Sequence, residues 1–357
     1  MLEQVSPTPT TYETGTFDYS GTGDVTGVVV PTNDIVIPPT TEPSSTSGCE
    51  PGDFTPAPAE PAVALVQRGT CTFEDKANNA IAAGYDAVII FNEGNPGREE
   101  LFIGTLSNPF EIPVVGLSFA DAAALYAQTQ AGPVVVHVAT VTEIDPTRST
   151  RNIIADSPTG NANRAVVVGA HLDSVIAGPG INDNGSGSAT ILEIAEEMAE
   201  LGIRNRQQVR FAFWGAEELN LLGSQHYVDN LSDQELQDIV ANLNFDMLGS
   251  PNYVRFVYDG DGSDTGPVGP PGSAQIEDIF NQYFASQGLA TEPTAFDGRS
   301  DYGPFIAVGI PAGGLVSGAE ARRPPRRPPS TAAPPASPTT PATTRPVTTS
   351  PTSAPRP

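Results

Sequence analysis

The sequence predicts an α/β protein: a three-layer α/β/α domain with a mixed, mostly parallel sheet, a smaller β-rich domain and a disordered tail. Three observations support this. Residues 148–318 alternate apolar runs with amphipathic segments, as strands alternate with helices. Residues 48–141 repeat the pattern on a smaller scale. Residues 321–357 contain 12 Pro, 8 Thr and no Asp or Glu, so they bury too little apolar surface to fold.

The smaller domain is predicted over residues 24–143, after an N-terminal remnant or linker at 1–23. Short apolar runs there indicate strands, and segments at helical spacing indicate helices, one of them capped by Ser118. The expected strands are residues 63–66, 87–91, 112–117 and 134–141, and the expected helices are 72–83 and 118–127.

The larger domain is predicted over residues 144–320. Residues 166–169 are apolar throughout, as is typical of a parallel strand buried on both faces. Further strands and helices follow in alternation, which predicts helices on both faces of the sheet. The other expected strands are residues 209–214, 240–245 and 253–258, and the expected helices are 186–201, 221–230 and 274–287.

Composition limits the partners of this chain. A length of 357 residues favours two domains. The net charge of −25 disfavours nucleic acid and anionic membranes as partners. Residues 1–320 carry all 42 acidic residues against 11 basic ones, a net charge of −31. We find no run of 18 apolar residues that would cross a membrane. The sequence does not indicate an oligomeric state.

Only two cysteines are present, Cys49 and Cys71. We prefer a disulfide between them, which implies an oxidising compartment and a secreted, extracellular protein. Two free thiols are the alternative. The first residues show no signal-peptide pattern. If the protein is secreted, we therefore expect that its N-terminal segment is missing from this sequence and that Met1 is an internal start.

Histidine and acidic residues follow the predicted strands of the larger domain. Because ligand sites in open α/β sheets form beyond the carboxyl ends of the strands, these side chains are expected to converge on one edge. Each motif alone is usually a surface turn, a helix start or a cap. Their common position at strand ends favours a metal site instead. The candidates are His171, Asp173, Asp183, Glu217, Glu218 and Asp246.

Mixed imidazole and carboxylate ligands suit Zn²⁺ better than Ca²⁺ or Mg²⁺. Asp183 could bridge two ions. The Asp173 carboxylate could accept the N–H of His171 and fix its tautomer. Glu217 is placed to take the proton from an attacking water. His137 and His226 lack such a setting and are interpreted as structural.

Several motifs carry a family resemblance. Residues 169–174, 178–187, 213–218 and 244–247 resemble the secreted bacterial di-zinc aminopeptidases of the co-catalytic zinc exopeptidase family. Residues 296–302 and 309–315 extend the match to about residue 320. In the smaller domain, residues 62–92 resemble the protease-associated (PA) domain often inserted in these enzymes, with a generic α/β module as the alternative.

The resemblance implies removal of an N-terminal residue, usually a large apolar one, from peptides with a free N-terminus. It also implies two zinc ions. Some relatives on this fold lack activity, so a catalytically silent, receptor-like PA-domain binding protein is the alternative. The resemblance implies that His171 and Asp246 bind the first zinc, that Asp183 bridges both ions and that Glu218 binds the second. It also implies that Glu217 is the general base, that Asp173 orients His171 and that Arg299 contacts the substrate.

One ligand of the resembled site is missing. The family's second zinc also takes a His after the Gly-Gly-Leu segment, yet no His follows His226. Read one base out of phase, the codons from Arg322 onward can encode a His shortly before Cys-Asp, over Thr344. We therefore expect a reading-frame shift near Glu320, with a natural Pro/Thr linker as the alternative. The second zinc site would then be incomplete and activity impaired.

Overall fold

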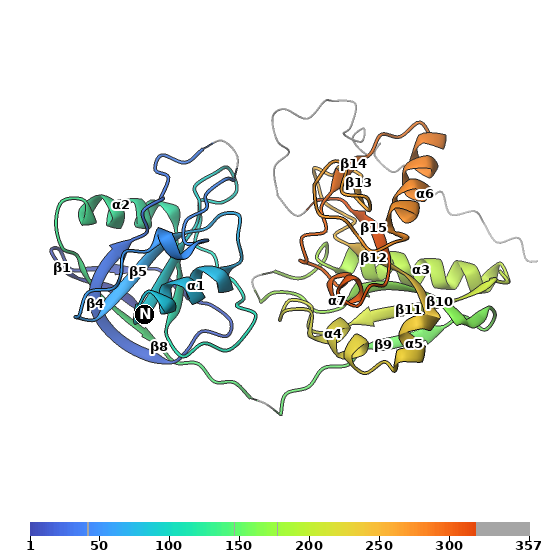
Figure 1. The fold of residues 1–357 in the computed structure, drawn as a ribbon, viewed down its shortest axis with the longest axis horizontal. Helices are drawn as coiled ribbons and strands as arrows, with labels where there is room; N and C mark the ends of the chain where they lie inside the picture. The colour runs from blue at the N-terminus through green and yellow to red at the C-terminus, as the bar shows by residue number, and fades with distance from the viewer. Residues whose placement is uncertain (41–42, 146, 177, 319–357) are drawn as a thin grey trace, which may run out of the picture.

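The computed structural model describes residues 1–40, 43–145, 147–176 and 178–318. It contains two domains, each built around its own sheet, which lie side by side (Figure 1). The predicted tail at 321–357 and the expected frame shift lie outside the described residues. Among the described residues, no helix combines the length and hydrophobicity needed to span a bilayer.

The first domain contains an eight-stranded mixed sheet in the order β2-β1-β8-β4-β5-β6-β7-β3. Its central strands β5 and β6 are buried along their full length, and helices α1 and α2 cover them (Figure 1). The elements are β1 (Leu2–Ser6), β2 (Thr10–Tyr12), β3 (Gly15–Thr16), β4 (Gly23–Pro31), η1 (Pro51–Asp53), β5 (Ala62–Gln67), α1 (Phe73–Ala82), β6 (Ala87–Phe91), β7 (Val114–Leu117), α2 (Phe119–Thr129) and β8 (Val135–Thr140).

The expectation of a remnant or linker at residues 1–23 is wrong. This segment supplies β1, β2 and β3, and β1 lies between β2 and β8 in the sheet. Leu2 is fully buried in the core. Loops and strands are expected over residues 1–47, but β1 could not be located, because its two apolar residues, Leu2 and Val5, point to opposite faces and give no periodic signal.

A disulfide joins Cys49 to Cys71, 22 residues apart. It ties the segment before η1 to the start of α1, where Thr72 caps the helix by accepting from the Asp75 N–H. The buried ammonium of Lys76 lies beneath it, donating to the Ser47 carbonyl. Burial lowers the pKa of Lys76 to about 8, although surrounding carboxylates act against the shift.

Replacing Cys49 and Cys71 together by Ser is expected to destabilise the first domain by about 3 kcal/mol, because a loop of this length then regains its freedom in the unfolded chain. In calorimetry, its unfolding temperature should fall by about 10 °C. The matched control is the unchanged chain in a strong reductant, which should show the same fall. A double variant with the same unfolding temperature as the unchanged oxidised chain would contradict this.

The second domain contains a seven-stranded sheet in the order β14-β13-β15-β12-β10-β11-β9. Parallel pairing joins β11, β10, β12 and β15, while β9 and β13 run antiparallel to their neighbours β11 and β15. The elements are β9 (Ile153–Asp156), β10 (Asn161–His171), α3 (Gly185–Glu200), β11 (Gln207–Trp214), α4 (Leu222–Asp229), α5 (Asp233–Asp238), β12 (Ile239–Asp246), β13 (Phe256–Tyr258), α6 (Ser273–Ser286), β14 (Glu292–Thr294), α7 (Gly303–Ala307) and β15 (Ala312–Val316).

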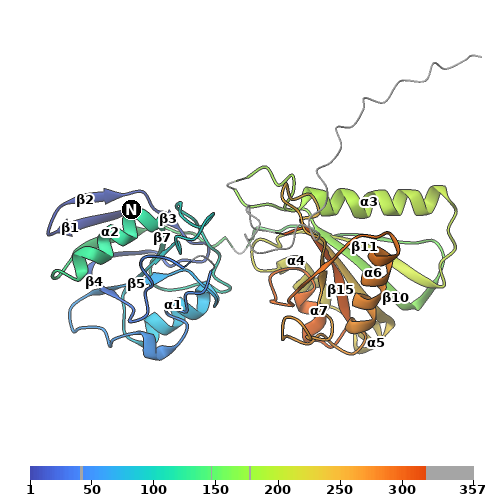
Figure 2. The same ribbon diagram turned by 90° about the horizontal axis from the view of Figure 1, so that it is seen from above.

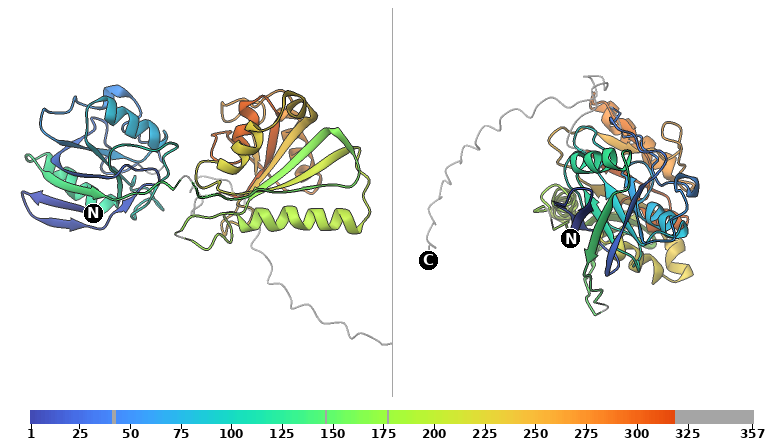
Figure 3. Two further views of the ribbon diagram at one scale, coloured as in Figure 1. Left: turned by 90° about the horizontal axis from the view of Figure 1, so that it is seen from below. Right: turned by 90° about the vertical axis from the view of Figure 1, so that its left-hand side faces the viewer.

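Helices cover both faces of this sheet, so the three-layer α/β/α architecture is confirmed. On one face, Ile191 of α3 and Phe280 of α6 pack in a core with Val168 and Phe245. Figures 2 and 3 show α3 running along the sheet. On the other face, α4 and α7 pack around Trp214. The strand expected at 253–258 is shorter, since β13 begins only at Phe256.

Candidate active site

The candidate residues of the second domain meet at one edge of its sheet. His171 is the last residue of β10 and Asp246 the last of β12, and these strands run parallel side by side. Trp214, at the end of the other neighbour β11, lies opposite His171 in the register. The turn after it brings Glu217 to the same edge. Three parallel strand ends thus present their polar residues together.

Asp183 reaches this edge from the loop before α3. The next residue, Asn184, is buried and caps α3, its Oδ1 accepting from the Gly187 N–H at 2.9 Å. Its Nδ2 donates to the Phe245 carbonyl at 2.9 Å. Asn184 therefore fastens the loop to the end of β12 and holds Asp183 beside Asp246.

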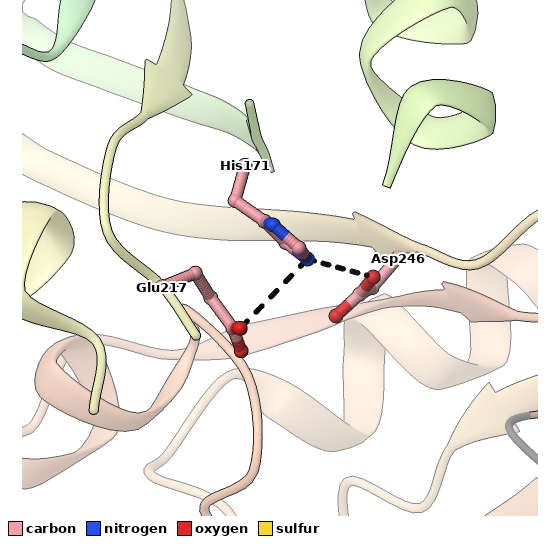
Figure 4. A group of neighbouring side chains, drawn as sticks. All are labelled: His171, Glu217 and Asp246. Carbon is pink, nitrogen blue, oxygen red and sulfur yellow. Dashed lines mark ion pairs between the residues drawn. The ribbon is translucent and has the colours of Figure 1, made fainter. Parts of the chain in front are cut away.

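The imidazole of His171 is the centre of the cluster (Figure 4). Its Nε2 lies 3.1 Å from Asp183 Oδ1, 3.3 Å from Asp246 Oδ1 and 3.8 Å from Glu217 Oε2. His171, Glu217 and Asp246 are buried and offer ligand atoms within 4.8 Å of one another. Glu218 lines the same cavity as Asp183, Glu217 and Asp246.

Carboxylates outnumber the one imidazole at this edge. Burial opposes a charged His171, yet the neighbouring Asp173, Asp183 and Asp246 outweigh it and raise the pKa of the ring. Burial raises the pKa of Glu217 well above its usual range. It also raises the pKa of Glu218 to about 7, with Asp183 adding to the shift. Such an excess of negative charge favours a bound cation.

The donor atoms themselves fit a metal ion. His171 Nε2, Asp246 Oδ1 and Glu218 Oε1 are buried and have no hydrogen-bond partner, although buried polar atoms normally have one. One imidazole nitrogen with several carboxylate oxygens is a set that suits zinc better than calcium or magnesium.

Asp173 holds both His171 and the turn after β11, but not in the way expected. The His171 Nδ1–H faces the backbone carbonyl of Asp173 at 3.2 Å, whereas the nearer carboxylate oxygen lies 3.6 Å away. The carboxylate instead accepts from the Glu217 and Glu218 backbone N–H groups, at 2.9 and 3.0 Å. The Asp173 carboxylate therefore mainly stabilises the Glu217–Glu218 turn by accepting its backbone N–H groups.

Two supporting residues escaped the sequence analysis. Asn244 Nδ2 donates to Ser300 Oγ at 2.8 Å, and Ser300 Oγ donates to Asp246 Oδ2 at 2.7 Å. All three side chains are buried. This chain of hydrogen bonds leaves Asp246 Oδ1 directed to the cluster. The signal in the sequence is that Asn242, Asn244 and Asp246 follow one another at alternate positions of β12.

A cavity of about 470 Å³ opens beside the cluster. The four carboxylates of Asp183, Glu217, Glu218 and Asp246 line one part of it, and Arg299 also reaches it. The apolar part of the wall comes from Met247, Val254, Phe256, Tyr258, Pro293, Ala295 and Val316.

His137 and His226 lie outside the cluster. His137 Nε2 is 2.8 Å from Asp24 Oδ1 in the first domain. His226 is exposed on α4, where its ring contacts Asn230. Neither contributes a donor to the metal-binding edge.

The first domain touches the turn that follows Glu217. Thr105 Oγ1 donates to the Glu218 carbonyl at 3.3 Å, and Asn220 Nδ2 donates to the Ser107 carbonyl at 3.4 Å. The Tyr19 hydroxyl donates to the Leu219 carbonyl at 3.4 Å. The two domains therefore meet at the edge that carries the cluster.

Comparison with known families agrees with this geometry. The sequence model described as peptidase family M28 matches residues 152–340, more than half of the chain. The chain belongs to peptidase family M28. The PA domain model matches residues 25–125, which confirms the PA domain in the first half of this M28 chain.

Curated relatives of this M28 chain are named aminopeptidases. An aminopeptidase of Pseudomonas aeruginosa (strain UCBPP-PA14) is 48% identical over 326 residues, covering 89% of this chain and 59% of the relative. Leucine aminopeptidase 2 of Trichophyton equinum is 44% identical over 279 residues, covering 78% and 55%. The chain thus spans somewhat more than half the length of these relatives.

Solved structures of aminopeptidases share the fold of this M28 chain. The aminopeptidase from Aneurinibacillus sp. strain AM-1 superposes with a TM-score of 0.67 at 27% identity, covering 89% of this chain and 71% of that one. A zinc aminopeptidase from Bacillus subtilis gives a TM-score of 0.63 at 29% identity, covering 89% and 72%.

Proposed function

We propose that this chain carries the catalytic machinery of a zinc-dependent aminopeptidase, which releases N-terminal residues from peptides. The observation that supports this most is that ligand atoms of His171, Glu218 and Asp246 lack hydrogen-bond partners beside a cavity with apolar walls. The names of the curated relatives support the same activity. The first test is hydrolysis of a leucyl-anilide, which a chelator should abolish and added zinc restore.

The metal centre is proposed to hold two zinc ions. His171 and Asp246 would bind the first, Asp183 would bridge, and Glu218 would bind the second. When bound, zinc polarises the scissile carbonyl and makes the attacking water more acidic. The mixed nitrogen and oxygen donors, and their lack of other hydrogen-bond partners, support this assignment.

Glu217 is the residue we assign as general base. Its Oε2 lies 3.8 Å from His171 Nε2, next to the metal donors, and burial raises its pKa. A base with a raised pKa accepts the proton of the attacking water more readily and can then pass it to the departing amine. The two hydrogen bonds to the Asp173 carboxylate hold the backbone of this turn in place.

The cavity suggests how a substrate is held. Its carboxylates can attract the free ammonium of a peptide N-terminus, and its apolar walls can accommodate a large apolar side chain. Arg299 reaches the same cavity and is proposed to contact the first residue of the peptide. The carboxylates disfavour an acidic first residue, since like charges repel at short range.

Replacing Asp173 by Asn is expected to lower kcat for leucyl-anilide by 10- to 100-fold, the usual cost of losing an outer partner of a metal site. The amide keeps the size of the side chain but sets an N–H donor against one of the two backbone N–H groups of the turn. Initial rates with saturating zinc measure the effect. Asp229→Asn, an exposed change on α4, is the control and should keep full activity. An Asp173→Asn rate within twofold of the unchanged chain would contradict the role.

Zinc titration is expected to give one tight and one weak equivalent. The first site has His171, Asp246 and the shared Asp183, whereas the second has only carboxylates, because no His follows His226. We therefore also expect impaired activity of this chain. Calorimetric titration and metal analysis after dialysis measure the two sites. Two tight zinc ions with full leucyl-anilide hydrolysis would contradict this expectation.

An extracellular location is proposed from the Cys49–Cys71 disulfide, since such bonds persist in oxidising compartments.

A silent binding protein on the same fold remains the competing function. A zinc-loaded chain that hydrolyses neither peptides nor leucyl-anilide would favour it.

A further inference from the structure

A second group of carboxylates lies outside the candidate active site. It forms where β13 ends, in the loop from residue 259 to 272, and at the start of α6. Asp259, Asp261 and Glu277 each offer a carboxylate oxygen within 4.8 Å of the others. The loop begins Asp259-Gly260-Asp261-Gly262-Ser263, with oxygen-bearing side chains at alternate positions. Figure 1 shows β13, β14 and α6 together on one side of the second domain.

Asp259 is fully buried and only one of its oxygens is used. Oδ2 accepts from the Asp264 N–H at 3.0 Å, and from the N–H and hydroxyl of Thr265 at 2.7 and 2.8 Å. Oδ1 is buried without any hydrogen-bond partner. Since Oδ2 is saturated, Oδ1 is the Asp259 atom free to face the other carboxylates. An unpaired buried carboxylate oxygen is costly and needs a compensating group.

No positive side chain compensates for it. Within the described residues, no Lys, Arg or His forms an ion pair with Asp259, Asp261 or Glu277. Glu277 Oε2 accepts from the Gly260 N–H at 2.8 Å, which ties α6 to the loop. Asp261 uses Oδ1 to accept from the Ser263 N–H at 2.9 Å, which leaves Oδ2 available. Three carboxylates are thus held together against their mutual repulsion.

We propose that Asp259, Asp261 and Glu277 bind a calcium ion, separate from the zinc centre. The site offers only oxygen ligands, which calcium prefers, whereas zinc favours sites that include nitrogen or sulfur. Carboxylates at alternate loop positions followed by a later Glu are typical of calcium loops. Gly262 has a φ of +69°, so the loop can turn sharply between the donors. Water would complete the six to eight oxygens that calcium takes.

The site is coupled to the cavity through two of its wall residues, Thr265 and Thr294. Thr265 donates twice to the same Asp259 carboxylate, and the Asp259 N–H donates to the Thr294 carbonyl at 2.9 Å. Calcium on Asp259 would therefore order the wall that faces the substrate side chain. This kinetic consequence rests on the proposed aminopeptidase function, whereas calcium binding itself does not.

Calorimetric titration of calcium into the zinc-saturated full chain tests the site. We expect one equivalent with a Kd of about 10⁻⁴ to 10⁻³ M, the range of extracellular calcium modules. The Asp261→Asn/Glu277→Gln double variant should show no uptake. Asp278→Asn is the matched control, because it removes one charge from the exposed neighbour of Glu277 on the same helix. It should bind as the unchanged chain does.

Asp261→Asn alone keeps the test informative if the double variant does not fold, because Asp261 is exposed. It should weaken calcium binding at least tenfold. In the unchanged chain, saturating calcium should lower KM for leucyl-anilide several-fold with little change in kcat. No calcium uptake, uptake that persists in the folded double variant, or equally tight magnesium binding would each overturn the proposal. Calcium uptake without peptide hydrolysis would instead reject only the aminopeptidase function.

Discussion

Replacing Glu217 by Gln is expected to lower kcat for leucyl-anilide about 10³-fold, within the range that general acid–base catalysis contributes. Gln keeps the length and polarity of the side chain but cannot accept the proton of the attacking water. Glu217 is not among the proposed zinc ligands, so the zinc affinity should change little.

The measurement combines steady-state kinetics with metal analysis on the same preparation. Glu193→Gln, an exposed change on α3, controls for loss of one acidic side chain and should retain full activity. A Glu217→Gln protein that keeps its zinc and hydrolyses leucyl-anilide at the original rate would reject Glu217 as the base. A protein that loses zinc would show that Glu217 is a ligand.

Replacing His171 by Ala is expected to weaken binding of the tight zinc by about 10³-fold or more. Loss of an outer partner of a metal ligand already costs 10- to 100-fold in affinity, and His171 supplies the central nitrogen of the cluster. The remaining Asp183, Asp246 and Glu217 carboxylates would be left without the imidazole nitrogen that they surround. Activity should fall with occupancy.

Zinc affinity by competition with a chromogenic chelator measures this loss. His226→Ala is the matched control, since it removes an imidazole of the same domain that lies outside the cluster. It should bind zinc as the unchanged chain does. If His171→Ala retains zinc with unchanged affinity, the site we assign is not the one that holds the metal.

Long periodic segments of the fold were predictable from the sequence, and short irregular ones were not. The apolar runs that became β5, β6 and β11, and the amphipathic α3, were placed within a few residues. The strands β9, β14 and β15 were missed. β14 contains a Pro, and β15 begins Ala-Gly-Gly, so neither shows the usual strand composition; their pairing depends on the neighbouring strands.

The site shows a similar division. Residues at strand ends, such as His171 and Asp246, could be inferred because parallel strands end at one edge. The use of the Asp173 backbone carbonyl could not, because side-chain spacing does not reveal which of two oxygens a ring N–H will face. Ser300 was hidden for another reason: its partner Asp246 is distant in the chain and meets it only after folding.

The convergence of strand ends has a consequence for the stability of the second domain. The donors are spread from residue 171 to residue 246, so an unfolded chain cannot present them together to one ion. Zinc is then a ligand of the native state alone, and free zinc shifts the folding equilibrium by mass action. At a concentration 1,000 times the Kd, this adds about 4 kcal/mol to the free energy of unfolding. Zinc bound at this edge would therefore also strengthen the pairing of β10 with β11 and β12.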